Sequence, residues 1–277
     1  MATSSARCTV CPHNAAQVTS IPIEYLAKGT HRATMREWVP EAPVALEFNG
    51  LSYAVMMATP AELEDFATGF ALAEGLIHRA ADISDIAIAE VEQGWIVRAT
   101  ISGLGIERLT ERVRTRVAES SCGLCGIENL AEVARALPPV AAHEAIIPAI
   151  IFSALVALRS QQPLARRTGA SHAAAWVAAS GAIGCLREDV GRHNAMDKLI
   201  GAMARAGRPL TPGFVLSTAR CSYEIVEKAA RGGATTLVTV SLPTSLAVER
   251  AQAAGLSLWA LARDDSVIAV NDASSRT

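Results

Sequence analysis

The chain has 277 residues, of which 51% are hydrophobic, 19% are charged and only 4% are aromatic, and its net charge is −2. This composition excludes intrinsic disorder, and the balance of charges argues against a nucleic-acid partner, since duplex binding requires a basic surface. The first residues lack the apolar segment of a signal peptide, and the longest apolar run, residues 145–158, is too short to span a bilayer. We therefore expect a cytoplasmic protein without a membrane partner.

The first predicted elements form a hairpin. Residues 1–20 are polar and irregular, so a flexible tail is expected there, with the first regular unit following Pro43. Residues 44–48 and 51–57 then flank Asn49-Gly50, a pair that favours the positive φ angles of a tight hairpin turn.

A helix and a second hairpin are expected next. Thr59-Pro60-Ala61-Glu62 has the pattern of a capping box with proline at the first helical position, which predicts a helix beginning there. Apolar residues from Leu63 to Ile77 recur on one helical face. Residues 86–101 alternate around Gln93-Gly94 and predict the second hairpin. The N-terminal half is therefore expected to be a small α+β domain over residues 21–137.

Four of the six cysteines form two C-x-x-C pairs, Cys8 with Cys11 and Cys122 with Cys125. In a chain without an export signal the thiols are expected to be reduced. Arginines precede Cys122 in the sequence and would raise the thiolate fraction of a nearby cysteine. Such a pair can be half of a zinc site, a redox dithiol or a carrier of persulfide sulfur. The two pairs together could complete a Cys₄ zinc site, unless the first belongs only to the tail.

Residues 138–147 are expected to link this half to a second domain over residues 148–277. There the predicted elements alternate between helix and strand, with a hairpin at the start, which indicates a three-layer α/β/α domain with a mixed sheet. The elements are expected as a helix at 149–160, strands at 172–179 and 182–187, a helix from about 193, a strand at 213–218, a helix at 222–231, a strand at 235–241, a helix at 244–254, and strands at 256–263 and 266–270.

Three junctions before helices of this domain are rich in small and polar residues: 189–194, 217–222 and 241–244. Ligands of α/β sheets bind beyond the carboxyl ends of the strands, where helix N-termini offer free N–H groups to anions. Arg192 and Arg220 can add charge-assisted bonds to phosphate. The pattern favours an anionic, phosphorylated ligand, although Ser222 and Thr244 could serve only as helix N-caps.

Other polar residues of this domain have ordinary structural explanations. His172 opens a strand, where a lone histidine is usually structural. Asp197 and Glu224 could act in acid/base chemistry, but carboxylates on helices are more often solvated. Cys185 and Cys221 are expected to be small core residues. The sequence holds neither a P-loop nor the H-x-E and P-C-x-x-C pattern of zinc deaminases.

Several of these motifs together resemble the FdhD family of formate dehydrogenase accessory sulfurtransferases. The strongest match is EDVGRHNAMDK at residues 188–198, and the similarity runs from about residue 20 to the end of the chain. The Cys8–Cys11 pair lies outside the pattern. The other matching stretches are residues 41–50, 59–75, 122–126, 168–173, 217–228 and 241–248.

The resemblance implies a function in sulfur transfer. Family members take sulfur from a cysteine desulfurase onto a C-x-x-C cysteine as a persulfide. They deliver it to the molybdenum or tungsten bis(molybdopterin guanine dinucleotide) cofactor of the formate dehydrogenase catalytic subunit. The resemblance further implies a homodimer, a second domain similar to the cytidine deaminase fold, binding of a guanine nucleotide such as GDP, and no tightly bound metal.

By position, the resemblance makes Cys122 the persulfide carrier and Cys125 its partner. This sequence departs from the family pattern at Leu261, where phenylalanine is expected, and at Ala170 and Ala219, where glycine is expected. The residues that would border the cofactor are Asp189, Gly191, Arg192, His193, Asn194, Arg220, Ser222, Thr244, Leu261, Ala262, Arg263, Asp264, Asp265 and Ser266.

Overall fold

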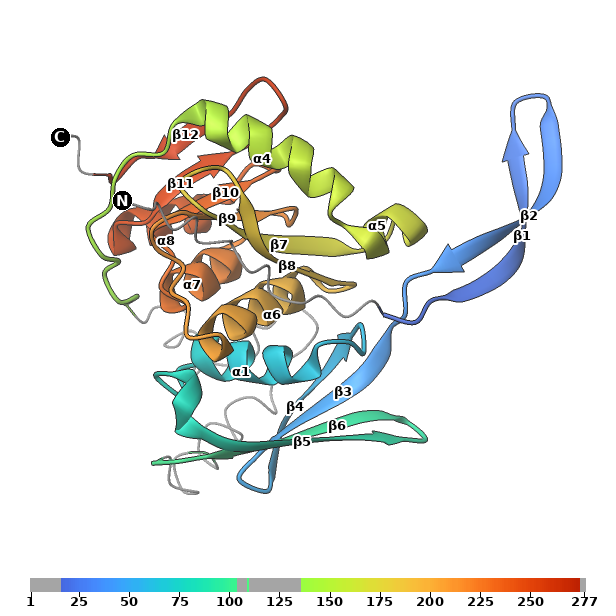
Figure 1. Cartoon of the computed structure of the whole chain (residues 1–277), viewed down its shortest axis with the longest axis horizontal. Coiled ribbons are helices and arrows are strands. Elements are labelled where there is room, and N and C mark those ends of the chain that lie inside the picture. Colours follow the sequence, from blue (N-terminus) through green and yellow to red (C-terminus); the bar gives the residue numbers. More distant parts are fainter. Residues whose placement is uncertain (1–15, 104–108, 110–135, 275–277) are drawn as a thin grey trace, which may run out of the picture.

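The computed structural model describes residues 16–103, 109 and 136–274. Its strands form a six-stranded sheet, a four-stranded sheet and a separate two-stranded hairpin (Figure 1). This arrangement confirms the predicted mixed α/β class. No helix within the described ranges is long and apolar enough to cross a membrane.

The four-stranded sheet has the order β4-β3-β6-β5 and packs one face on helix α1. Asn49 and Gly50 adopt φ angles of 49° and 81°, so the first predicted hairpin is confirmed together with its turn. Phe48, Tyr53 and Phe70 form an aromatic cluster between sheet and helix. The elements of this N-terminal unit are β3 (Ala42–Phe48), β4 (Leu51–Ala58), α1 (Leu63–Ala73), the 3₁₀ turn η1 (Ala80–Asp82), β5 (Ile83–Val91) and β6 (Gly94–Ile101).

The predicted capping box at the start of α1 is wrong. The helix begins at Leu63, and its N-cap is Glu62, which has a φ of 55° and makes no side-chain cap bond. Thr59 cannot cap the helix because its backbone and hydroxyl groups bond to Asp189, Val190 and Lys198 of the C-terminal half. The local pattern was correct for a helix start, but tertiary bonds displaced it by several residues.

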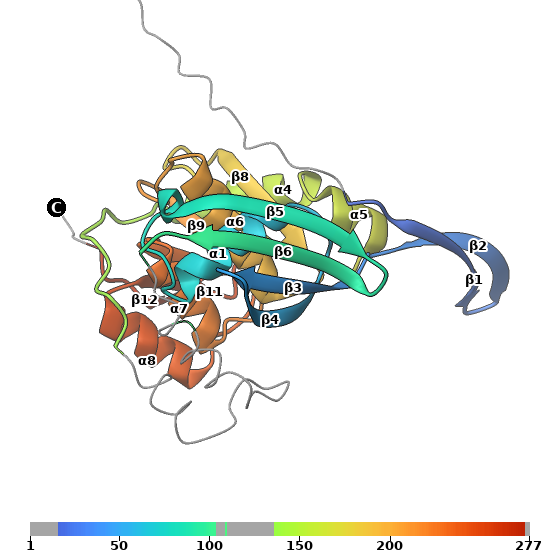
Figure 2. The same ribbon diagram turned by 90° about the horizontal axis from the view of Figure 1, so that it is seen from below.

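A long hairpin before the first predicted element was missed. β1 (Thr19–Ala27) and β2 (Thr30–Trp38) pair in antiparallel register along their whole length. We refer to residues 19–38 as the arm, which projects away from both sheets in Figures 1 and 2. Its base is held by two bonds of 2.8 Å from the Arg167 guanidinium to the Glu37 carboxylate. The arm lacks a buried face, so the usual pattern of an amphipathic strand was absent from its sequence.

The C-terminal sheet has the order β12-β11-β10-β9-β7-β8, with β8 to β11 running in one direction and β7 and β12 against them. The predicted hairpin and the alternation that follows it are confirmed, whereas the short helix α5 was not predicted. The elements are α4 (Pro148–Ser160), α5 (Pro163–Thr168), β7 (His172–Val177), β8 (Ile183–Asp189), α6 (Arg192–Arg205), β9 (Phe214–Ser217), α7 (Tyr223–Arg231), β10 (Thr236–Thr239), α8 (Ser245–Ala254), β11 (Ser257–Ala260) and β12 (Ile268–Asn271).

Helices cover both faces of this sheet, as predicted. Successive strand residues point to opposite faces, so Val215 joins the core beneath α6, α7 and α8, while Leu216 joins the core beneath α4. Figure 1 shows α4 on one side of the sheet and α6 to α8 on the other. These are the three layers expected of an α/β/α domain.

The two units meet where α1 crosses α6, and small residues make the approach close. A Cβ atom added to Gly69 would lie 1.7 Å from the Asp197 carbonyl oxygen, and one added to Gly201 would lie 1.9 Å from the Asp65 carbonyl oxygen. α1 therefore lies between its own sheet and α6 (Figure 1). The expected division into two domains with a linker at 138–147 stays a prediction.

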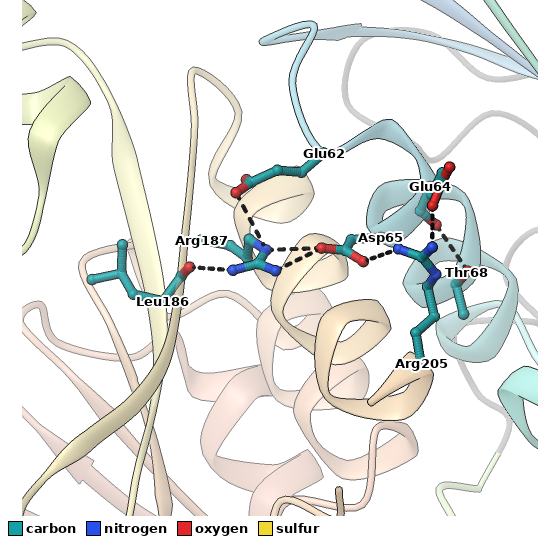
Figure 3. Close-up of polar contacts among 7 residues, drawn as sticks. All are labelled: Glu62, Glu64, Asp65, Thr68, Leu186, Arg187 and Arg205. Carbon is teal, nitrogen blue, oxygen red and sulfur yellow. Dashed lines mark hydrogen bonds and ion pairs between the residues drawn. The ribbon is translucent and has the colours of Figure 1, made fainter. Parts of the chain in front are cut away.

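Ion pairs flank this crossing (Figure 3). Buried Arg187 donates from Nε and Nη2 to Asp65 Oδ2 at 2.9 and 2.8 Å, and Arg205 Nη1 donates to Asp65 Oδ1 at 2.6 Å. Glu62 and Glu64 complete the group through Arg187 and Arg205 respectively. We refer to these five residues as the crossing cluster. Because its charges are paired, burial does not leave an isolated ion between the units.

Candidate functional site

The three predicted junctions lie along one edge of the six-stranded sheet. β8, β9, β10 and β11 all point toward this edge, so the loops at 189–193, 218–222, 241–244 and 261–266 emerge there together. We refer to it as the carboxyl edge. The start of β7 lies at the same edge because His172 pairs with Asp189 in the antiparallel register.

Hydrogen bonds connect neighbouring loops along the carboxyl edge. The Cys221 N–H donates to Ser241 Oγ at 3.1 Å, and the Thr244 N–H donates to the Cys221 carbonyl at 3.0 Å. The Leu261 N–H donates to the Ser241 carbonyl at 3.2 Å. The loops after β9, β10 and β11 are thus held in fixed positions relative to one another, which pre-organises their side chains for a ligand.

His172 lies between two arginines of this edge, although its sequence context favours only a structural explanation. β7 is inserted between β9 and β8, so His172 falls between the loop that carries Arg220 and the loop that leads to Arg192. Burial lowers the pKa of His172, and the positive charge of Arg192 lowers it further. The register of the predicted hairpin could have placed His172 at this edge, because His172 pairs with Asp189 at the end of β8.

Arg192 Nε and Ser222 Oγ are buried at this edge and have no hydrogen-bond partner among the residues that the structure describes. Ser222 is the N-cap residue of α7, yet its side chain accepts no cap bond. Ser222 thus occupies the N-cap position without a side-chain cap bond, whereas Thr244 caps α8 by accepting from the Ala247 N–H at 3.3 Å. Unpaired buried polar groups are costly, and an anionic ligand would give both of these donors a partner.

His193 and Glu224 extend the charged surface down two helices. His193 Nε2 lies 3.0 Å from Glu224 Oε2, and the hydrogen bond from His193 lowers the pKa of Glu224. Next to them, Lys228 Nζ donates to both carboxylate oxygens of Asp197 at 2.8 and 2.9 Å. Asp197 is thus buried and paired, so the expectation of a solvated side chain is wrong for it, whereas Glu224 is paired but half-buried.

Asp189 and Asn194 lie beneath the edge and are almost fully buried. Gly191 adopts an extended conformation at the N-terminus of α6 and donates its N–H to Asp189 Oδ1 at 2.7 Å. The structure brings these residues to the predicted place, where they hold the loop that precedes Arg192. Their direct contact with a cofactor stays a prediction.

The loop after β11 forms a turn at the far end of the edge. Leu261 has a φ of 50°, and the Arg263 N–H donates to the Ser266 carbonyl at 2.7 Å. Asp264 pairs with Arg159 of α4 at 3.0 Å, and Asp265 accepts from the Ser266 hydroxyl at 2.9 Å. Ala262 is buried against the sheet. The exposed residues Arg263 to Ser266 lie at this end of the carboxyl edge, and their contact with a cofactor stays a prediction.

The C-x-x-C of Cys122 and Cys125, and the pair Cys8 and Cys11, lie outside the described residues. Cys185 and Cys221 are both buried, as expected for core cysteines. Burial raises the pKa of the Cys221 thiol to about 11, so this cysteine is a poor nucleophile although it lies at the carboxyl edge.

Comparison with known proteins gives one consistent result. Residues 39–275 match the model of the FdhD/NarQ family. The sulfur carrier protein FdhD of Cupriavidus necator is 48% identical over 227 residues, which cover 82% of this chain and 79% of the relative. The sulfur carrier protein FdhD of Variovorax paradoxus is 44% identical over 234 residues, or 84% of each chain.

A solved structure shows the same fold. It comes from Desulfotalea psychrophila and was assigned provisionally as a formate dehydrogenase accessory protein. The superposition has a TM-score of 0.73 at 24% identity and covers 92% of this chain and 97% of the other.

Proposed function

The chain belongs to the FdhD/NarQ family, and on that premise we propose that it is a sulfur carrier protein that serves formate dehydrogenase. The observation that carries the proposal is the identity of 48% with a sulfur carrier protein over most of both chains. A sulfur carrier requires a reactive thiol and a binding site for the acceptor. The C-x-x-C and the carboxyl edge are the candidates for these two parts.

Cys122 would accept the sulfur. Its thiolate attacks the outer sulfur of a cysteine desulfurase persulfide, a new S–S bond forms, and the desulfurase cysteine leaves as a thiolate. Attack of the Cys125 thiolate on the sulfur of Cys122 then forms a Cys122–Cys125 disulfide and releases the outer sulfur as sulfide. The dithiol supplies the two electrons of this step. The acceptor is the molybdenum or tungsten of the bis(molybdopterin guanine dinucleotide) cofactor, which is the substrate in this scheme.

The carboxyl edge would bind a guanine nucleotide half of that substrate through its pyrophosphate. Arg192 and Arg220 on either side of His172 support this assignment, as do Arg192 Nε and Ser222 Oγ, which are buried without a partner in the described part of the chain. Guanidinium groups and helix N-termini are the donors that phosphate oxygens prefer.

Two copies of the chain would associate through the arm. Leu26 is 72% exposed at the tip of the arm, beside the basic residues Lys28 and Arg32. The turn between β5 and β6 carries the opposite charge, because Glu90 and Glu92 are exposed there among apolar side chains. A two-fold symmetric exchange would bury both surfaces at once. A two-stranded hairpin exposed on both faces is marginally stable alone, which favours such a contact.

Mass spectrometry after incubation with a cysteine desulfurase and cysteine tests the sulfur step. The peptide that holds Cys122 is expected to gain one sulfur atom, and Cys122→Ala is expected to abolish both this gain and the activation of formate dehydrogenase in a deletion strain. Cys125→Ala is the matched control and should still accept sulfur. Full activation by Cys122→Ala would refute the scheme.

The same purified protein distinguishes this function from the alternative functions. One stoichiometric zinc ion that is lost when Cys8 is mutated would support a zinc-stabilised binding protein. Reduction of insulin disulfides without a desulfurase would support a dithiol oxidoreductase. GDP at millimolar concentration is expected to raise the thermal midpoint by mass action, and the absence of a shift would contradict the nucleotide site.

A further inference from the structure

Thr59 connects the N-terminal unit to the loop that follows β8. Its backbone N–H donates to Asp189 Oδ2 at 3.0 Å, and its hydroxyl accepts from the Val190 N–H at 3.0 Å. Its carbonyl accepts from Lys198 Nζ at 2.9 Å. Thr59 is only 1% exposed, so these bonds are made away from water. One residue of the N-terminal unit therefore contacts the C-terminal unit at three points.

Asp189 is the centre of this group, and its carboxylate has no acceptor capacity left. Besides Thr59, Oδ2 contacts Lys198 Nζ at 2.6 Å, and both of these side chains are 0% exposed. Oδ1 accepts from the Gly191 N–H at 2.7 Å and from Asn194 Nδ2 at 3.0 Å. Four donors saturate the two oxygens. The carboxylate of Asp189 therefore holds the loop that precedes Arg192.

Asn194 adds a second connection between the units. Its Nδ2 also donates to the Met57 carbonyl at 2.8 Å, at the end of β4. We refer to Thr59, Asp189, Asn194 and Lys198 as the clamp. It fixes the backbone at Val190 and Gly191, and α6 begins at the next residue, Arg192. The position of Arg192 at the carboxyl edge thus depends on a threonine of the other unit.

We propose that Thr59 is a positioning residue for nucleotide binding at the carboxyl edge, and that the clamp couples occupancy of this edge to the N-terminal unit. The proposal rests on the nucleotide site of the proposed function. In the sequence, β4 and β6 lead on to the C-x-x-C, so the clamp joins the unit that precedes the sulfur-carrying cysteines to the loop before Arg192. Coupling of this kind is reciprocal, because a ligand that favours the clamped loop must also favour the contact at Thr59.

The crossing cluster provides a matched control at the same interface. Arg205 lies at the opposite end of α6 from Arg192, which at 1.5 Å per residue is about 20 Å away. Among the described residues its ion pairs are with Asp65 and Glu64 of α1, which are not members of the clamp. Loss of Arg205 should weaken the interface without moving the loop before Arg192.

Binding of GDP to three variants of the full-length chain tests the proposal. Thr59→Val keeps the shape and backbone bonds of Thr59 but removes the acceptor for the Val190 N–H, and it is expected to raise the Kd for GDP roughly tenfold. Thr59→Ser restores the hydroxyl and should bind GDP as the unmodified chain does. Arg205→Gln should lower the Tm but leave the Kd unchanged.

Hydrogen exchange provides a measurement that would not change if Thr59 had a purely structural role. GDP is expected to slow exchange of the Thr59 amide in the unmodified chain, in Thr59→Ser and in Arg205→Gln, and to slow it less in Thr59→Val. Unaltered GDP affinity in Thr59→Val, or an equal loss in Arg205→Gln, would overturn the clamp while leaving the proposed function intact. Failure of the unmodified chain to bind GDP would overturn the nucleotide site and the clamp together.

Discussion

Replacement of Gly69 by alanine tests whether the α1–α6 crossing holds the two units together. Gly69 is buried within α1, and a Cβ atom at this position would lie 1.7 Å from the Asp197 carbonyl oxygen of α6. An ordinary Cβ contact lies at 3.4–4 Å, so the two helices would have to separate by roughly 1.7 Å. Helix propensity and packing predict opposite effects of this substitution on the free energy of unfolding.

Propensity alone predicts that alanine stabilises the interior of a helix by about 1 kcal/mol relative to glycine. Packing predicts a cost of about 3 kcal/mol or more, since the neighbouring atom is backbone and cannot rotate away. The net expectation is a loss of about 2 kcal/mol in the free energy of unfolding. For a chain of this size each kcal/mol shifts the Tm by about 2–4 °C, so the Tm should fall by about 4–8 °C.

Thermal unfolding followed by circular dichroism measures this shift. Gly75→Ala is the control, because Gly75 has a φ of 67° with no atom within 4 Å of an added Cβ, so only backbone strain of about 1 kcal/mol is expected. A Tm for Gly69→Ala at or above that of the unmodified chain would refute the close crossing. A loss no larger than that of Gly75→Ala would do the same.

Three further predictions concern other parts of the molecule. Because the pKa of His172 is lowered in the fold, its protonation costs stability as the pH falls below its ordinary value of 6.5, and a bound pyrophosphate should offset this cost. The rise in Tm caused by GDP should therefore be larger at about pH 5.5 than at about pH 7.5, and His172→Asn should remove the difference. Cys185 and Cys221 should resist maleimide at neutral pH until denaturant is added, since both are buried; rapid labelling of either would contradict this. Leu26→Asp should shift the sedimentation of the protein from dimer to monomer without lowering helix content, and an unchanged dimer would exclude the arm as the contact.

Local patterns predicted most helices and strands of the C-terminal half. Buried strands, glycine turns and helix starts are encoded by neighbouring residues, so the order from His172 to Val270 agrees with the structure to within a few residues at most boundaries. The same alternation required the junctions at Arg192, Arg220 and Thr244 to share one edge of the sheet. The arm was missed because neither of its faces is buried within the chain.

The sequence by itself determined the α/β class, the order of the C-terminal elements and the candidate residues of the carboxyl edge. Only the tertiary structure decided the roles of Thr59 and Asp189, since the carboxylate that accepts the hydrogen bond from the Thr59 N–H lies 130 residues further along the chain. A capping box is a local sequence pattern, so it contains no information about a buried carboxylate that another unit supplies. Hydrogen bonds to that buried carboxylate stabilise the fold more than a helix cap would. Tertiary hydrogen bonding therefore set both the start of α1 and the position of the loop before Arg192.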